Sequence, residues 1–195
     1  MGKAGLIGLL IALLTIVVLA STVQSGPQPA PHTARAVASA PAEAVGGEPA
    51  LVLPVAGVSP SAISDTWGQS RAAGARAHRG TDIMAPRGAR VVAAVDGTIE
   101  KLFESGDGGT TLYERTRDGQ WSFYYAHLAG YAPGIEEGQV VRAGQTIGFV
   151  GDTGNAGAGN YHLHFGVSRM VGPQGWWTGQ PVNPYPLLAR ARPAR

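Results

Sequence analysis

Hydrophobic and polar residues alternate in short runs from about Leu51 onward. Runs of this length, separated by glycine-containing turns, are typical of β-strands and not of helices. The predicted strands cover residues 91–95, 98–103, 110–115, 121–126, 146–150 and 161–167. Asp118-Gly119 predicts a tight hairpin between the third and fourth strands, and Asp96-Gly97 predicts a similar turn between the first two. The pattern therefore predicts a mainly β, antiparallel domain.

The last predicted strand separates apolar from polar positions, because side chains alternate between the two faces of a strand. Its apolar members share the face that would enter the core: Tyr161, Leu163, Phe165 and Val167. His162 and His164 share the opposite face with Gly166. Two neighbouring imidazoles on a strand with an apolar back form a rigid platform for a metal ion.

The N-terminal segment, residues 1–23, shows a different pattern. From Leu6 to Val23 it carries no charge and has no polar face, which a helix of a globular domain would show. The segment predicts a hydrophobic N-terminal helix that is either an export signal or a membrane anchor. Either role predicts that the remainder works outside the cytoplasm, in a periplasm or cell envelope, and is held at the inner membrane if the segment is retained.

Composition divides the rest of the chain. Residues 24–50 are rich in Pro, Ala, Gly and Ser without a hydrophobic period, and predict a flexible linker. Residues 51–188 form the predicted domain, and residues 189–195 are predicted to be a basic, disordered tail. The chain contains no cysteine, which excludes disulfides and thiolate metal ligands.

The charge distribution argues against one class of partner. The formal net charge is +2, but residues 51–185 carry ten basic and eleven acidic side chains. The excess comes from Arg190, Arg192 and Arg195 at the end of the chain. Nucleic-acid binding needs basic residues clustered on a folded surface, so no nucleic-acid partner is expected.

Four of the five histidines fall into three short segments that suit zinc chemistry. His78 with Asp82, together with one histidine of the pair His162 and His164, can supply two imidazoles and a carboxylate to a metal ion. Three protein ligands and an open position for water are the arrangement of a hydrolytic zinc site. His127 and the remaining histidine of the pair would then handle protons.

Other hydrolytic and nucleotide-binding motifs are missing from the sequence. It has no His-Glu-x-x-His motif, and no Gly-x-Ser-x-Gly motif that would position a serine nucleophile. The glycine-rich run over residues 151–159 lacks the Gly-Lys-Ser/Thr ending of a phosphate-binding loop. We therefore interpret that run as a loop leading into the histidine strand.

Several short segments occur in a fixed order between about Pro54 and Leu188. They include Asp65-Thr66-Trp67-Gly68, His78-Arg79-Gly80-Thr81-Asp82-Ile83, Asp96-Gly97-Thr98-Ile99, Tyr125-Ala126-His127-Leu128, Ile147-Gly148-Phe149-Val150-Gly151, Thr153-Gly154, His162-Leu163-His164-Phe165 and Asn183-Pro184. In this order they resemble the lysostaphin-type (LytM-like) zinc metallopeptidases, which cut peptide bridges in bacterial peptidoglycan. The resemblance implies a twisted antiparallel sheet, a partly open barrel or sandwich, with one zinc ion in a groove.

The resemblance also implies roles for individual residues. His78, Asp82 and His164 would bind the single Zn²⁺ ion, whose activated water would attack the scissile carbonyl. His127 and His162 would act as general base and transition-state stabilisers. The expected function is that of an exported, monomeric endopeptidase that acts on peptidoglycan stem and cross-link peptides, with membrane contact through its N-terminal segment.

Two alternatives remain open at this point. A non-catalytic relative would bind the wall or activate another hydrolase, but such proteins typically lack some of these residues. A carboxypeptidase, or a peptidase with an envelope protein as substrate, would differ in its groove loops, where Trp176-Trp177 either lines the groove or packs. Some relatives are held latent by a prosegment asparagine, and because no asparagine precedes Asn155, no latency of that kind is expected.

Overall fold

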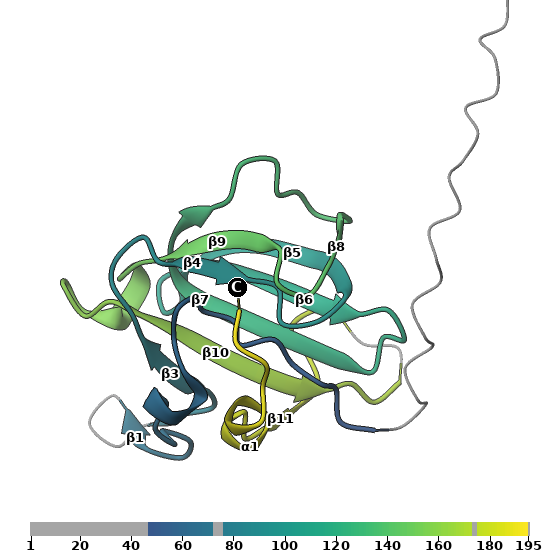
Figure 1. Cartoon of the computed structure of the whole chain (residues 1–195), viewed down its shortest axis with the longest axis horizontal. Coiled ribbons are helices and arrows are strands. Elements are labelled where there is room, and N and C mark those ends of the chain that lie inside the picture. Colours follow the sequence, from purple (N-terminus) through teal and green to yellow (C-terminus); the bar gives the residue numbers. More distant parts are fainter. Residues whose placement is uncertain (1–46, 72–75, 173–174, 195) are drawn as a thin grey trace, which may run out of the picture. The chain divides into compact units, whose positions relative to one another are not determined.

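The computed structural model describes residues 47–71, 76–172 and 175–194 (Figure 1). The predicted N-terminal helix over residues 1–23 lies outside these residues, as does the linker up to residue 46. Within the described ranges, no helix has the length and apolar character needed to cross a bilayer.

The described residues form short strands and a few helical turns. The strands are β1 (Ser70–Arg71), β2 (Arg76–Ala77), β3 (Thr81–Met84), β4 (Arg90–Val92), β5 (Gly97–Ser105), β6 (Gly109–Thr116), β7 (Trp121–Tyr131), β8 (Val140–Val141), β9 (Thr146–Val150), β10 (His162–Arg169) and β11 (Gln180–Val182). The helical elements are the 3-10 turns η1 (Pro60–Ala62) and η3 (Gly154–Ala156), and the helix α1 (Tyr185–Ala189).

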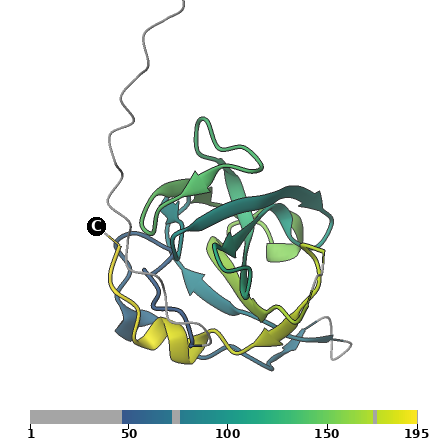
Figure 2. The ribbon, with the colours of Figure 1, turned by 90° about the vertical axis from the view of Figure 1, so that its right-hand side faces the viewer.

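One antiparallel sheet dominates the fold, which confirms the predicted class. Its strands run in the order β11-β10-β7-β6-β5-β8, with β3 added to β10, β9 added to β7, and β4 added to β9. Each of these pairings is antiparallel. Viewed from the side in Figure 2, the ribbon curls around its interior, but the strand path from β11 to β8 is not closed into a barrel.

The two predicted turns have different outcomes. The hairpin at Asp118-Gly119 is confirmed: the Gly119 amide donates to the Thr116 carbonyl over 2.9 Å, and Gly119 has a φ of 73°, which glycine adopts without strain. The prediction of a hairpin at Asp96-Gly97 is wrong, because the strands on either side of it do not pair with each other: β4 pairs with β9, while β5 pairs with β6 and β8. The apolar segment 93–95 between β4 and β5 is buried, so the chain passes through the core there instead of reversing at the surface.

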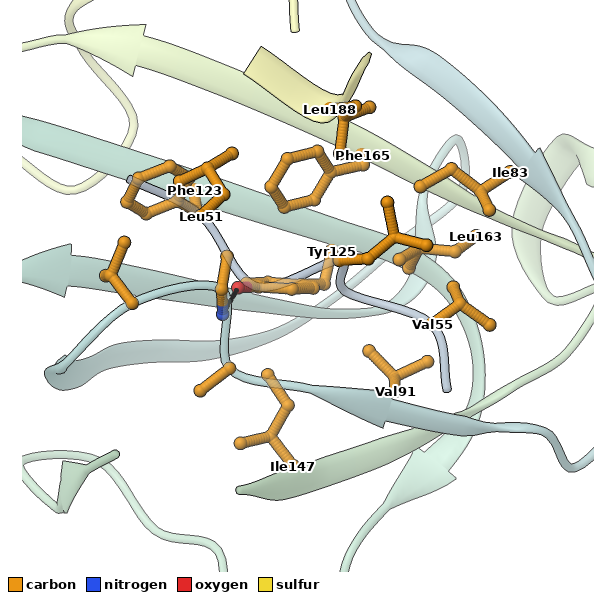
Figure 3. Packing of buried hydrophobic residues seen from close by; sticks show 14 of the residues in the cluster. Leu51, Val55, Ile83, Val91, Phe123, Tyr125, Ile147, Leu163, Phe165 and Leu188 are labelled. Atoms are coloured by element: carbon orange, nitrogen blue, oxygen red, sulfur yellow. Dashed lines mark hydrogen bonds between the residues drawn. The ribbon is translucent and has the colours of Figure 1, made fainter. Parts of the chain in front are cut away.

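The core lies on the inner face of the sheet and includes Leu51 and Val55, which precede the first strand, and Leu188 of α1 (Figure 3). Tyr125 stands at its centre, where its hydroxyl donates to Glu114 and accepts from the Ala94 amide at 2.9 Å. Glu114 is fully buried, and its Oε1 atom has no hydrogen-bond partner. Burial raises the pKa of Glu114 to about 7, although hydrogen bonds from Tyr125 and from backbone amides act in the opposite direction.

The end of the chain differs from the disordered tail expected over residues 189–195. Ala191 is buried, the Arg192 amide donates to the Leu51 carbonyl at 2.9 Å, and the Arg192 carbonyl accepts from the Leu53 amide at 2.8 Å. These bonds satisfy backbone groups of both segments, so the domain extends at least to Arg192. The arginines at the end of the chain predicted a solvated tail. Backbone hydrogen bonds hold this segment in place, and the side-chain composition carries no signal for such bonds.

Candidate metal centre

Strand pairing brings the first and last histidine segments together. In the antiparallel pair of β10 with β3, His164 lies directly opposite Asp82. Directly opposed residues on neighbouring strands have closely spaced side chains. His78 lies between β2 and β3, four residues before Asp82. This segment is a loop that leads into β3, and Gly80 favours such a loop. The candidate metal site is therefore formed by two paired strands, β3 and β10, and the loop that precedes β3.

Three polar atoms converge at this point. His78 Nε2 lies 3.1 Å from Asp82 Oδ1, and His164 Nδ1 lies 3.1 Å from the same oxygen. The two imidazole nitrogens are 2.8 Å apart. Tetrahedral zinc with bonds of about 2.1 Å separates its ligand atoms by roughly 3.4 Å, which is close to these distances. His78, Asp82 and His164 are therefore arranged to hold one metal ion.

The tautomer of His78 fits a metal ligand. Its Nδ1 lies 2.7 Å from the Thr66 carbonyl, which can only accept, so Nδ1 carries the proton and Nε2 keeps its lone pair. A backbone carbonyl in this position is the usual support of a histidine ligand. The backbone amide of Asp82 donates to Thr66 Oγ1 at 3.0 Å, so one threonine positions two of the three candidate ligands.

The electrostatics keep the cluster in the form that a metal ion needs. Burial alone would raise the pKa of Asp82, but hydrogen bonds and charge interactions with His164 and His78 outweigh burial and lower it well below its ordinary value. Burial lowers the pKa of His164, which favours its neutral ring. A carboxylate and neutral imidazoles are the protonation states that bind zinc.

His127 and His162 lie beside this cluster with matching orientations. His127 Nδ1 donates to the Thr153 carbonyl at 2.8 Å, and His162 Nδ1 donates to the Asn160 carbonyl at 2.8 Å. In the neutral form of each ring the lone pair is therefore on Nε2, and His162 Nε2 lies 3.8 Å from Asp82 Oδ1. The two ring centroids are 4.8 Å apart. Burial lowers the pKa of His127 to about 4, so its ring is neutral at neutral pH.

His127 also has an unusual backbone. It is the one non-glycine residue with a positive φ among those described, at 62°. The register of β7 shifts near this position against both β6 and β9, and the His127 amide donates to the Gly108 carbonyl at 2.8 Å. Left-handed backbone at a non-glycine residue costs energy and tends to persist at functional sites.

All five predicted residues line one open cavity of about 500 Å³. Three arginines, Arg71, Arg76 and Arg79, also line it. The other polar residues in its wall are Asp107, Tyr124, Asn155 and Asn160. Trp176 and Trp177 are not among the lining residues, so the tryptophan pair does not form the wall of this cavity.

The structure adds supporting residues that the sequence did not identify. Arg71 donates to Asp82 Oδ2 at 2.5 Å, and the carbonyls of Thr66, Thr153 and Asn160 hold the histidine rings. Carbonyls carry no side-chain signal, although Thr66 and Thr153 lie in segments noted above for their order. At Gly80, a Cβ atom would lie 2.6 Å from both Cε1 and Nε2 of His164, so the ring position requires glycine there.

Comparison with known proteins agrees with this geometry. The L-Ala–D-Glu endopeptidase of Bacillus subtilis (strain 168) is 36% identical over 148 residues, which is 73% of this chain and 43% of the relative. The peptidoglycan DD-endopeptidase ShyC of Vibrio cholerae is 37% identical over 95 residues, 49% of this chain and 21% of the relative. The matched region is thus less than half of either relative.

The fold has solved counterparts. The catalytic domain of the antimicrobial peptidase lysostaphin from Staphylococcus simulans superposes with a TM-score of 0.54 at 28% identity, covering 65% of this chain and 90% of that domain. The model of Peptidase family M23, a family of zinc peptidases, matches residues 76–184, which include His78, Asp82, His127, His162 and His164. The chain belongs to Peptidase family M23.

Proposed function

We propose that this chain is an exported zinc-dependent endopeptidase that hydrolyses peptide cross-links of bacterial peptidoglycan. One observation carries the proposal: three residues that could hold a metal ion, His78, Asp82 and His164, share an open cavity with two further histidines, and Nδ1 of each of these two donates to a carbonyl and leaves Nε2 directed elsewhere. A purely structural metal site would not need the second pair. A non-catalytic relative would not need all five residues.

The metal ligands in this proposal are His78, Asp82 and His164. When bound, zinc supplies a Lewis acid that polarises the scissile carbonyl and lowers the pKa of water. Asp82 is fixed through Oδ2 by Arg71, which leaves Oδ1 for the ion. His78 is fixed through its Nδ1–H by the Thr66 carbonyl, which leaves Nε2 for the ion.

His127 and His162 perform the proton chemistry in this proposal. Because Nδ1 of each ring donates to a carbonyl, the neutral ring has its lone pair on Nε2, which can accept the proton of an attacking water and pass it to the leaving amine. The protonated ring can also donate from Nε2 to the oxyanion of the transition state. The ring centroids of His127 and His162 are 4.8 Å apart. In this proposal one ring transfers the proton and the other stabilises the oxyanion.

A peptide substrate follows from the shape and polarity of the cavity. The cavity is open and lined by arginines, asparagines and carboxylates, which suits an extended polar peptide better than an apolar side chain. The names of two relatives, L-Ala–D-Glu endopeptidase and peptidoglycan DD-endopeptidase, support peptides of peptidoglycan. Access to that polymer requires export, for which residues 1–23 supply the hydrophobic segment, cleaved or retained as an anchor. The enzyme acts as a monomer in this proposal.

Mass spectrometry of peptidoglycan after digestion tests the function and identifies the bond. The purified chain with zinc should convert cross-linked dimers to monomers, while His164→Ala should leave them intact. New termini in the products distinguish a cross-link bond from a stem-peptide bond or a terminal D-amino acid. Undigested dimers with zinc confirmed in the protein would contradict the proposal and point to a wall-binding or activating protein.

A further inference from the structure

A series of aromatic rings leads away from the metal centre across the outer face of the sheet. Each neighbouring pair has centroids within the range of favourable ring contacts. The centroid distances are 5.8 Å for His164–Tyr124, 4.7 Å for Tyr124–Tyr113, 4.9 Å for Tyr113–Trp176, 5.1 Å for Trp176–Phe103 and 5.3 Å for Trp176–Trp177. We call the five residues Tyr124, Tyr113, Trp176, Trp177 and Phe103 the aromatic platform.

Strand register places this platform on the same face as the metal centre. Gly166 of β10 pairs with Tyr124 of β7, which pairs with Tyr113 of β6, which pairs with Lys101 of β5. Paired residues share a face, and His164 shares the face of Gly166 because it is two residues away. Gly166 has no side chain, and a Cβ there would lie 3.3 Å from the Tyr124 Cβ, so the tyrosine has room beside the cluster.

Tyr124 belongs both to the cavity and to the platform. It lines the cavity with His164 and contacts Tyr113, which in turn contacts Trp176. The platform is thus a continuation of the cavity wall and not a separate patch. A ligand that fills the cavity and extends past Tyr124 would meet these rings next.

The outer end of the platform is exposed but well supported. Trp177 is 67% exposed and Phe103 is 40% exposed, which is unusual for large apolar side chains that lie together. Trp176 is held between Phe103 and Tyr113, and the ring of Trp177 lies over Gly175, where a Cβ would be 2.6 Å from its Cζ3 atom. The Thr178 hydroxyl donates to the Gly175 carbonyl at 2.8 Å and closes this turn.

The chemistry of the platform matches the apolar face of a sugar ring. The face of an aromatic ring has a negative electrostatic potential, and the axial C–H groups of a hexopyranose carry partial positive charge. The two faces therefore stack favourably. Anionic lipid would require free cations, but Lys101, the cation in this strand row, is paired with Glu137 at 2.7 Å. In peptidoglycan each short peptide is attached to a strand of N-acetylated hexopyranoses, so a sugar lies within a few residues of any peptide bond in the cavity.

We propose that the aromatic platform binds the glycan strand that carries the peptide held in the cavity. This inference rests on the proposed function and adds a carbohydrate subsite to it. Trp177 and Phe103 supply the exposed stacking faces, and Trp176 holds them in position. The platform orients the polymer so that its peptide extends past Tyr124 towards the metal centre.

Binding of the full chain to peptide-free glycan strands tests the subsite without any cleavage. Wild-type protein should bind, with a change in tryptophan fluorescence, and Trp177→Ala and Phe103→Ala should each weaken binding about tenfold. Val140→Ala is a matched control, since it removes an apolar side chain that is 62% exposed on β8, which pairs with Gly97 and Thr98 at the start of β5 and not with the segment that holds Phe103. Absence of wild-type binding, or equal binding by all variants, would overturn the inference. So would binding to phospholipid vesicles, but not to glycan, that depends on Trp177.

A second measurement separates this inference from the proposed function. The ratio of cleavage rates on cross-linked sacculi and on glycan-free cross-linked peptides should fall about tenfold in Trp177→Ala and stay constant in Val140→Ala. An unchanged ratio in Trp177→Ala would overturn the subsite while the peptidase function stands. Glycan binding by a protein that cleaves neither substrate would support the subsite and contradict the peptidase function.

Discussion

Arg71 and Asp82 form an ion pair in which the two carboxylate oxygens of Asp82 have different partners. Arg71 donates to Oδ2 at 2.5 Å, while Oδ1 lies 3.1 Å from both His78 Nε2 and His164 Nδ1. The arginine therefore fixes the rotamer of Asp82 and directs a single oxygen at the candidate metal position. Groups that orient metal ligands in this way commonly contribute tenfold or more to affinity.

Arg71→Gln should therefore weaken zinc binding by roughly 10- to 100-fold and reduce activity at limiting zinc. The Asp82 carboxylate would lose its anchor and sample rotamers in which neither oxygen faces the histidines. Competition with a chromogenic chelator measures the change in affinity. Arg117→Gln is the matched control, because that arginine is 56% exposed and pairs with Asp96 at 3.7 Å, away from the cluster. Equal zinc affinity in both variants would contradict the positioning role.

Gly80→Ala should displace His164 and lower zinc affinity, although alanine is chemically inert. The added Cβ would lie 2.6 Å from two atoms of the imidazole ring and 2.9 Å from the Phe165 carbonyl, so the ring or the backbone must move. Zinc content after dialysis against a weak chelator measures the loss. Gly106→Ala provides the comparison, because no heavy atom lies within 4 Å of its added Cβ. Full zinc retention by Gly80→Ala would disprove the tight-packing argument.

His127→Ala should retain one zinc ion per chain and lose about 10²- to 10⁴-fold in kcat. The metal ligands would stay in place, since His127 touches them only through a ring contact with His164 at 5.9 Å. Parallel measurement of metal content and kcat separates the proton-transfer role from a structural one. Full activity in this variant would show that His127 handles no proton, and loss of zinc would assign it to the metal site.

The pH dependence of stability should contain a contribution from Glu114. Its folded-state pKa is raised from 4.5 to about 7 by burial, so the folded chain binds a proton more tightly than the unfolded chain. This contribution is complete below about pH 4.5 and is lost as the pH rises through about 7, with a total of roughly 3 kcal/mol. His127, whose pKa is lowered to about 4, acts in the opposite direction between about pH 4 and 6.5.

The Glu114 contribution is isolated by comparing wild type with Glu114→Gln, since His127 is common to both. The difference in the free energy of unfolding should change with pH between about 4.5 and 7, in favour of the glutamine variant as the pH rises. Urea denaturation at several pH values measures it. Glu104→Gln, at an exposed carboxylate, should follow the wild-type curve. Parallel curves for wild type and Glu114→Gln would mean that Glu114 does not titrate in this range.

Much of the fold was predictable because strand signals are local. The strand predicted over residues 146–150 coincides with β9, and the alternation along β10 separated the core residues Leu163 and Phe165 from the histidines. The pairing of β4 with β9 was not predictable in the same way. It depends on the burial of segment 93–95, which is determined by contacts far apart in the sequence.

The site was predictable only at the level of side chains. Histidine and aspartate at the observed spacings indicate a metal site whatever the details of the fold, and His78, Asp82 and His164 do converge. Their orientation depends on backbone carbonyls, such as that of Thr153, and any residue can supply a carbonyl. The same holds for the left-handed backbone of His127, which arises from the register shifts of β7 against its two neighbours.

The zinc-dependent peptidase activity can be tested by titrating zinc into metal-stripped protein and measuring the release of monomers from cross-linked peptidoglycan at each step. We expect activity to rise in proportion to added zinc, to stop rising at one equivalent per chain, and to be absent at every step in His164→Ala. Cleavage by the stripped protein would show that the activity does not depend on zinc. A chain that binds one equivalent of zinc through these residues and leaves every cross-link intact would contradict the proposed function.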